Sequence, residues 1–200
     1  MSINLMIRAS DLPDAEAQCL WIIRKNLGDE VPVPEIYGWR VDGDYVFIYM
    51  ELPQDPFIGS LSRGHLSDII IESQPPGGLF AIIKQFSECF SSLPWLGFTL
   101  ASNFKDPWRE YLPDDGSIKP TPGDLYRGNI IVSPTTPPRA LAIIDWAHCG
   151  WFPDYWEYCK AAHTCLYGGK WLNKWFPKFL TPWVEVHGIF AEYTYGMGAF

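Results

Sequence analysis

Residues 121–132 read TPGDLYRGNIIV, and residues 140–146 read ALAIIDW. The apolar runs at 129–133 and 140–144 are separated by a proline-rich turn, which predicts a β-hairpin. Asp124 stands in the turn before the first strand, Asn129 at the start of that strand, and Asp145 at the end of the second. Because a hairpin brings its two ends together, we expect these three side chains to converge on one site.

Those three residue types suit phosphoryl transfer. The reaction needs a carboxylate that orients and deprotonates the acceptor hydroxyl, and oxygen ligands for Mg²⁺ on the phosphates. Asp124 is the candidate base, while Asn129 and Asp145 offer the hard oxygen ligands that Mg²⁺ prefers. The alternative interpretation is two Asx turns flanking an ordinary hairpin.

The rest of the chain predicts an α+β fold. A strand is expected at residues 3–9, then a helix in which Glu16, Leu20, Ile23 and Leu27 fall at helical spacing and which Gly28 ends. Strands at 35–41 and 44–52 flank Asp42-Gly43, a strong hairpin signal. Residues 61–72 and 79–93 and most of the chain after Pro153 favour helix, whereas 94–120 reads as irregular. Ten tryptophans, five of them in the last 50 residues, predict a bulky aromatic core.

Charge and composition narrow the partners. The 200 residues include 15 basic and 23 acidic side chains, a net charge of −8. A chain this acidic and without basic clusters is a poor ligand for nucleic acid or for an anionic membrane. No apolar run approaches the roughly 18–20 residues of a membrane span, and the N-terminus lacks the pattern of a signal peptide. We therefore expect a cytoplasmic protein with neither partner.

The five cysteines, at positions 19, 89, 149, 159 and 165, contain no Cys-x-x-Cys pair. Unpaired thiols are the simplest interpretation. Cys159, His163 and Cys165 have a spacing that zinc ligands can show, but helix-face spacing explains it better, because no paired Cys knuckle is present.

On these residues the chain resembles the aminoglycoside phosphotransferase and choline-kinase-like family, which has the protein-kinase-like fold, and most of all its divergent fungal members. The family's catalytic loop, His-Gly-Asp-x4-Asn, corresponds to Pro122-Gly123-Asp124 and Asn129. Its metal motif corresponds to Ile143-Ile144-Asp145-Trp146. Two more stretches carry the resemblance, which covers about residues 5–160: VPVP at 31–34 with a hairpin ending in Met50-Glu51, and GWFPDYWE at 150–157.

The resemblance implies a two-lobed, ATP- and Mg²⁺-dependent phosphotransferase acting on a small-molecule hydroxyl. A truncated N-lobe would span residues 1–52, with a small antiparallel sheet, and a mostly helical C-lobe would span 53–200. Backbone groups of the hinge residues Met50, Glu51 and Leu52 would meet the adenine.

Two further residues are implied at the nucleotide phosphates. Glu16 would pair with the residue at the family's phosphate-binding lysine position, which here is Arg8. The alternative is a surface strand residue for Arg8 and a solvated helix residue for Glu16.

Two departures from the family pattern favour a second hypothesis. Pro122 replaces the family's histidine, and no glycine-rich phosphate-covering hairpin precedes Arg8. Without such a hairpin we expect weak ATP binding and slow turnover. The rival is therefore a pseudokinase-like binding module, or a truncated fragment, without turnover.

Asp154 and Glu157 lie among aromatic residues, which suggests a cationic substrate. The alternative is the N-terminus of a helix that begins after Pro153.

Overall fold

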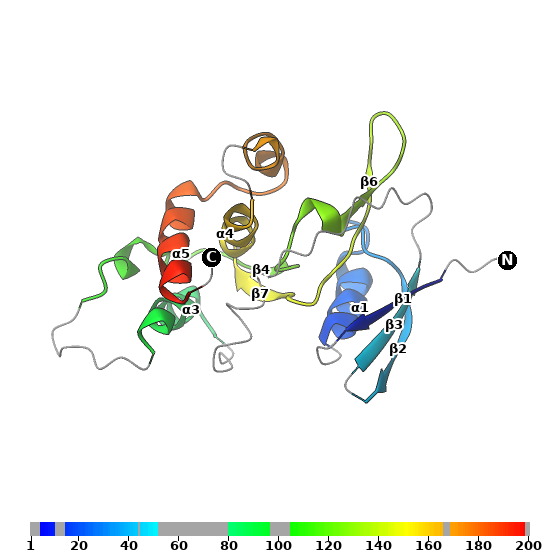
Figure 1. Cartoon of the computed structure of the whole chain (residues 1–200), viewed down its shortest axis with the longest axis horizontal. Coiled ribbons are helices and arrows are strands. Elements are labelled where there is room, and N and C mark those ends of the chain that lie inside the picture. The colour runs from blue at the N-terminus through cyan, green and yellow to red at the C-terminus, as the bar shows by residue number, and fades with distance from the viewer. Residues whose placement is uncertain are drawn as a thin grey trace. The chain divides into compact units, whose positions relative to one another are not determined.

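Figure 1 shows the computed structural model, which describes residues 5–10, 15–43, 45–51, 80–96, 105–165 and 169–198. For residues 5–10 and Ala15 it describes the backbone alone. The chain forms two compact units, Met1–Arg63 with Pro122–Gly150, and Gly64–Thr121 with Trp151–Phe200. The boundary expected at Leu52 lies outside the described residues. The predicted division placed residues 122–150 in the C-lobe, whereas the structure groups them with the N-terminal residues in the first unit.

The first unit contains a three-stranded antiparallel sheet in the order β1-β3-β2. Its strands are β1 (Leu5–Ser10), β2 (Ile36–Asp42) and β3 (Tyr45–Glu51), and the helix α1 (Ala15–Leu27) connects β1 to β2. The turn between β2 and β3 contains Gly43 with φ +64°, which suits an Asp-Gly hairpin. The structure thus confirms the predicted strand, helix and hairpin, each within a few residues of its expected bounds.

The core of this unit lies between α1 and one face of the sheet, and Figure 1 shows the helix beside the three strands. Strand β3 alternates between buried and more exposed positions, the pattern of a strand with one covered face. Its buried residues meet the apolar face of the helix, together with one valine and one tryptophan from elsewhere in the unit. The members are Ala17, Leu20, Ile23, Val33, Val46, Ile48, Met50 and Trp146.

The predicted second hairpin is formed by β5 (Ile130–Val132) and β6 (Ala140–Ile143), which pair antiparallel. The Ile143 amide donates to the Pro32 carbonyl at 2.7 Å. This bond ties the end of the hairpin to the VPVP segment, whose backbone cannot be helical.

The second unit is built on aromatic packing among three helices, α3 (Ile83–Ser92), α4 (Trp156–His163) and α5 (Val184–Gly196). The ring of Phe90 lies 5.1–5.4 Å from those of Trp156, Phe190 and Tyr193. The expected aromatic core is therefore present, although Trp151 is largely exposed. In the described part of the chain, no helix is long and apolar enough to cross a membrane.

Shorter elements complete the unit. Strand β4 (Ile118–Thr121) pairs with β7 (Gly150–Pro153), and neither strand was predicted. Each has four residues and includes a proline, which lacks a backbone donor, so neither gives a recognisable strand pattern. Short helical turns occupy Leu93–Trp95, Arg109–Tyr111, Trp171–Trp175 and Phe176–Lys178. The helix expected at 61–72 lies outside the described residues.

A histidine pair joins α4 to α5. The ring centroids of His163 and His187 are 6.3 Å apart, and aromatic rings, including those of Tyr158 and Phe190, surround them. His187 Nε2 is buried and has no hydrogen-bond partner among the described residues. Burial lowers the pKa of both imidazoles, and the nearby His163 lowers the pKa of His187 further.

This pair predicts a loss of stability in mild acid. The histidines of the unfolded chain bind protons near pH 6.5, whereas those of the folded chain resist protonation until a lower pH. Their contribution is therefore fully present above about pH 6.5 and is lost as the pH falls toward the lowered pKa values. Replacing His187 by Asn removes one titrating group, so the melting temperature of His187→Asn should fall less steeply between about pH 7.5 and 5.5. Parallel curves for wild type and His187→Asn would contradict this.

Candidate functional site

The loop between Gly123 and β5 holds Asp124 and Asn129 together. Asn129 Nδ2 donates to the Asp124 carbonyl at 2.9 Å and to Asp124 Oδ2 at 3.1 Å. The backbone supports this loop, because the Tyr126 amide donates to the Asp124 carbonyl and the Asn129 amide to the Tyr126 carbonyl. Asn129 is only 7% exposed, whereas Asp124 is half-buried. The asparagine therefore orients the aspartate, with Pro122 two residues before it.

Asp145 lies directly beyond the residue that pairs with Asn129. Ile130 is paired with Ile143, and the Ile144 amide donates to the Asn129 carbonyl at 2.9 Å. The hairpin thus brings the backbone of Asp145 to the end of the loop that carries the other two residues. Asp145 has φ +65°, a left-handed conformation that aspartate tolerates better than most residues and that ends the strand here.

Gly123 allows the loop to approach the turn after Asp145. It has φ +78°, and a Cβ atom there would lie 2.2 Å from the His148 carbonyl oxygen. The two segments therefore meet backbone to backbone, at a separation that only glycine permits. The sequence offered Gly123 as part of a motif but gave no sign of this contact.

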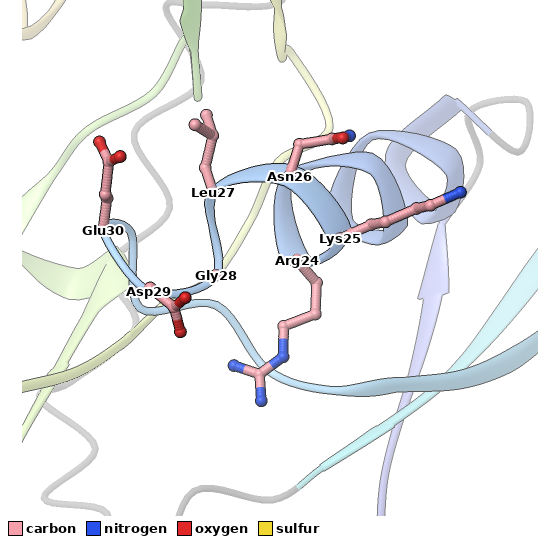
Figure 2. A pocket seen from close by; sticks show the side chains of 7 residues that line it. All are labelled: Arg24, Lys25, Asn26, Leu27, Gly28, Asp29 and Glu30. Atoms are coloured by element: carbon pink, nitrogen blue, oxygen red, sulfur yellow. The ribbon is translucent and has the colours of Figure 1, made fainter.

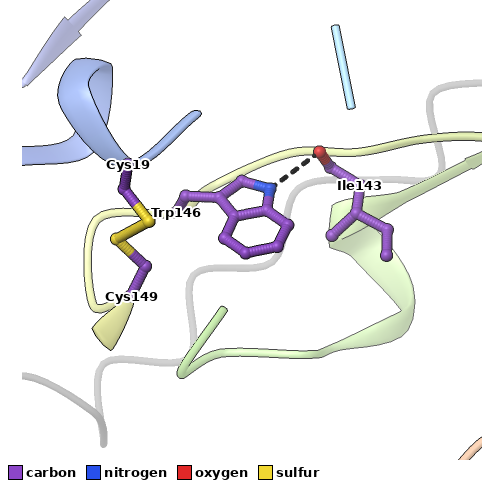
Figure 3. Close-up of a disulfide and its surroundings, with 4 residues drawn as sticks. All are labelled: Cys19, Ile143, Trp146 and Cys149. Carbon is purple, nitrogen blue, oxygen red and sulfur yellow. Dashed lines mark hydrogen bonds between the residues drawn. A yellow bond between two sulfur atoms is a disulfide. The ribbon is translucent and has the colours of Figure 1, made fainter. Parts of the chain in front are cut away.

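Trp146 and Cys149 fasten the turn to the core of the unit (Figure 3). Trp146 is 2% exposed within the core, and its Nε1 donates to the Ile143 carbonyl at 3.0 Å. Cys149 forms a disulfide with Cys19 of α1, and the two Cα atoms are 6.8 Å apart. The expectation of unpaired thiols is therefore wrong for Cys19 and Cys149. The cause is a contact between residues 130 positions apart, which no local spacing reveals.

Cys89 and Cys159 are thiols that form no disulfide, and burial raises the pKa of the Cys159 thiol well above its ordinary value. No group of three or more His, Cys, Asp or Glu side chains is arranged to hold a metal ion in the part of the chain that the structure describes. Asn129 lies outside that residue set. Asp124, Asn129 and Asp145 each offer a side-chain oxygen atom as a metal ligand, which fits Mg²⁺ better than zinc.

Glu16, predicted to lie at the nucleotide phosphates, is on the first turn of α1 and is 1% exposed. The alternative of a solvated helix residue is therefore wrong for Glu16. The backbone of Arg8 pairs with that of Ile48, a core residue of the central strand, and its side chain is not described. A pairing between Arg8 and Glu16 stays a prediction.

The residues predicted to form the adenine-binding hinge, Met50, Glu51 and Leu52, have different surroundings. Met50 is buried in the core, and the Glu51 amide donates to the Glu35 carbonyl at 2.8 Å. Glu51 Oε2 also accepts from the Glu35 amide at 3.4 Å. The Glu51 amide is therefore engaged within the sheet, and an adenine contact from Leu52 stays a prediction on a residue outside the described set.

The pair predicted to meet a cationic substrate lies at the start of α4. Glu157 is buried in the first turn of that helix, where a carboxylate suits the helix dipole. Asp154 is half-buried, and its amide donates to the Ser117 carbonyl. The helix-start interpretation therefore accounts for Glu157.

Sequence reasoning passed over Arg127, which lies in the same loop. Its Nε donates to Tyr126 Oη at 3.2 Å, and the guanidinium carbon lies 5.7 Å from the centroid of the Tyr126 ring. Arg127 is exposed and is the only Lys or Arg in residues 121–132. In the sequence, Arg127 could have been noticed as an isolated positive charge between Asp124 and Asn129.

A surface pocket of about 260 Å³ lies elsewhere, at the C-terminal end of α1 (Figure 2). It is lined by residues 24–30, and none of the predicted site residues belongs to it. In Figure 2, Leu27 and Glu30 extend to one side of the loop and Arg24 to the other.

No protein-family model matches the chain, and no curated protein matches it. Among solved structures, the chain is similar to an aminoglycoside-3'-phosphotransferase of type VIII, with a TM-score of 0.42 and 16% sequence identity. The alignment covers 97% of this chain and 77% of that one. The function proposed below rests on the residues of this chain.

The contact at Gly123 predicts a specific sensitivity of the loop. Gly123→Ala must strain a left-handed backbone and displace the His148 carbonyl, so it should destabilise the protein by more than about 2 kcal/mol. Gly43→Ala is the matched control, because Gly43 has a similar φ but a Cβ atom added there would meet nothing within 4 Å. Its cost should be about 1–2 kcal/mol, from the backbone strain alone. Urea denaturation checks both, and equal losses would show that the Gly123–His148 contact is unimportant.

Proposed function

We propose that this protein is a kinase-like phosphotransferase that moves the γ-phosphoryl group of ATP, with Mg²⁺, to a hydroxyl group of a small molecule. The observation that carries the proposal is the hydrogen bond from the Asn129 amide to the Asp124 carboxylate, beside the strand end that bears Asp145. A base and two oxygen ligands on one hairpin are what phosphoryl transfer requires of a protein.

Asp124 is the proposed general base. Asp124 is half-buried, and Asn129 donates a hydrogen bond to its carboxylate, which orients that group. The carboxylate would accept the hydroxyl proton as the oxygen attacks the phosphorus. A positioned base of this kind contributes about 10²–10⁴-fold to the rate.

Asn129 and Asp145 are the proposed metal ligands. The Asn129 amide nitrogen is engaged with Asp124, which leaves the amide Oδ1 outside these bonds as a hard oxygen donor. Asp145 would add a carboxylate from the adjacent strand end. When bound, Mg²⁺ neutralises charge on the phosphates and holds them in place.

Glu16, Arg8 and Leu52 complete the proposed nucleotide site. Glu16 is buried on α1, and Cys19, one turn further along the helix, is linked to the turn that follows Asp145. This link ties the helix that carries Glu16 to the segment that carries the metal ligand. In the proposal Glu16 holds the guanidinium of Arg8 toward the phosphates, and the Leu52 backbone meets the adenine.

The proposed base predicts a separation of turnover from binding. Asp124→Asn should lower the rate of phosphate transfer or ATP hydrolysis by about 10²–10⁴-fold. It should leave the affinity for Mg²⁺-ATP nearly unchanged, since the base contacts the acceptor and not the nucleotide. Asp29→Asn, an exposed substitution in the same unit, is the control and should change neither. Calorimetric titration and a coupled phosphate assay measure the two quantities.

The same measurements distinguish the enzyme from a binding module without turnover. Wild-type protein that binds Mg²⁺-ATP, transfers phosphate to no hydroxyl or amino acceptor in a broad panel, and hydrolyses ATP no faster than Asp124→Asn would be a binding module. Absence of Mg²⁺-ATP binding would contradict both the phosphotransferase proposal and the binding-module alternative.

A further inference from the structure

Residues 158–184 reverse the charge of the protein locally. This stretch contains four of the eight lysines and no Asp or Glu, in a chain whose net charge is −8. Lys160 is buried in α4, whereas Lys170, Lys174 and Lys178 are exposed. Within the described part of the chain, none of these three ammonium groups has a carboxylate within 4.0 Å, in contrast to Lys84 and Lys105.

Two exposed aromatic side chains are next to these lysines in the sequence, Trp175 after Lys174 and Phe179 after Lys178. Trp175 is 42% exposed and Phe179 is 47% exposed. The Lys174 and Lys178 ammonium groups lie 5.5 and 4.7 Å from the centroid of the Trp175 ring, so one indole has two cations beside it. We call Lys170, Lys174, Trp175, Lys178 and Phe179 the basic aromatic surface.

Packing underneath holds this surface in place. Phe176 is fully buried, and its ring lies 5.5 Å from that of Trp171 and 5.8 Å from that of Phe179. The Trp171 ring also lies 5.8 Å from the Phe179 ring. Exposed rings that are fixed to a core need little further ordering when they bind a partner.

We propose that the basic aromatic surface binds the headgroup layer of an anionic lipid bilayer. Indole rings favour the boundary between headgroups and acyl chains, and lysines are attracted to the negative leaflet. Binding at the membrane surface strengthens with buried apolar area and with attraction to anionic lipids, and this surface offers both contributions. Nucleic acid fits less well, since the surface has no arginine, the side chain that pairs best with phosphate. No membrane partner was expected, because the whole chain is acidic and has no basic cluster in its sequence. The lysines of this surface are four residues apart and form no continuous basic run.

Sedimentation with vesicles tests the proposal, which does not depend on the phosphotransferase activity. Full-length protein should co-sediment with phosphatidylcholine and phosphatidylserine vesicles at a molar ratio of about 2:1, and not with phosphatidylcholine alone. Each lysine near such a surface is worth about a five-fold gain in partitioning, so Lys174→Glu with Lys178→Glu should reduce binding by at least about 25-fold. Trp175→Ala should reduce it several-fold.

Matched controls separate this surface from net charge and from loss of folding. Lys84→Glu with Lys105→Glu changes the net charge equally, and Trp151→Ala removes another exposed indole. Both should bind like wild type, and every variant should melt within a few degrees of it. No difference between the two vesicle types, or equal losses for the two lysine pairs, would overturn the proposal. So would tighter binding of a single-stranded oligonucleotide that the Lys174→Glu, Lys178→Glu change abolishes.

Discussion

The pair of hydrogen bonds from Asn129 Nδ2 to Asp124 is the constraint on which the candidate site depends. It orients the carboxylate that would act as the base, and Asn129 itself lies directly before β5. The Asn129 carbonyl accepts a hydrogen bond from the Ile144 amide. This bond places the next residue, Asp145, beside the loop that carries Asn129. One asparagine therefore connects the other two proposed functional residues, Asp124 and Asp145.

The surroundings of this asparagine explain why the loop can hold its shape. Gly123 brings the loop against the His148 carbonyl, and Trp146 inserts into the core formed by α1 and β3. The disulfide between Cys19 and Cys149 joins the helix and the turn covalently. Packing against an apolar core and a covalent cross-link both help to keep the polar groups of the site oriented. Positioning of groups is the main contribution of a protein to phosphoryl transfer.

The features predicted from sequence are those with a local signal. Asp42-Gly43 predicted a hairpin, the spacing of Leu20, Ile23 and Leu27 predicted α1, and the spacing of Asp124, Asn129 and Asp145 predicted residues that share a hairpin. The features that sequence missed depend on contacts between distant residues. Cys19 forms a disulfide with Cys149, 130 positions away in the sequence. The pairing of β4 with β7 joins two short strands with proline, and neither carries a periodic pattern.

The most direct test of the proposed metal site is the thermal shift caused by ATP with and without Mg²⁺, compared among wild type, Asp145→Ala and Arg8→Ala. Asp145 would contact the metal, the largest local charge in the site, whereas Arg8 would contact only phosphate oxygens. We expect a Mg²⁺-dependent rise in melting temperature for wild type, a smaller rise for Arg8→Ala and none for Asp145→Ala. An equal Mg²⁺-dependent rise for wild type and Asp145→Ala would contradict the assignment of Asp145 as a metal ligand.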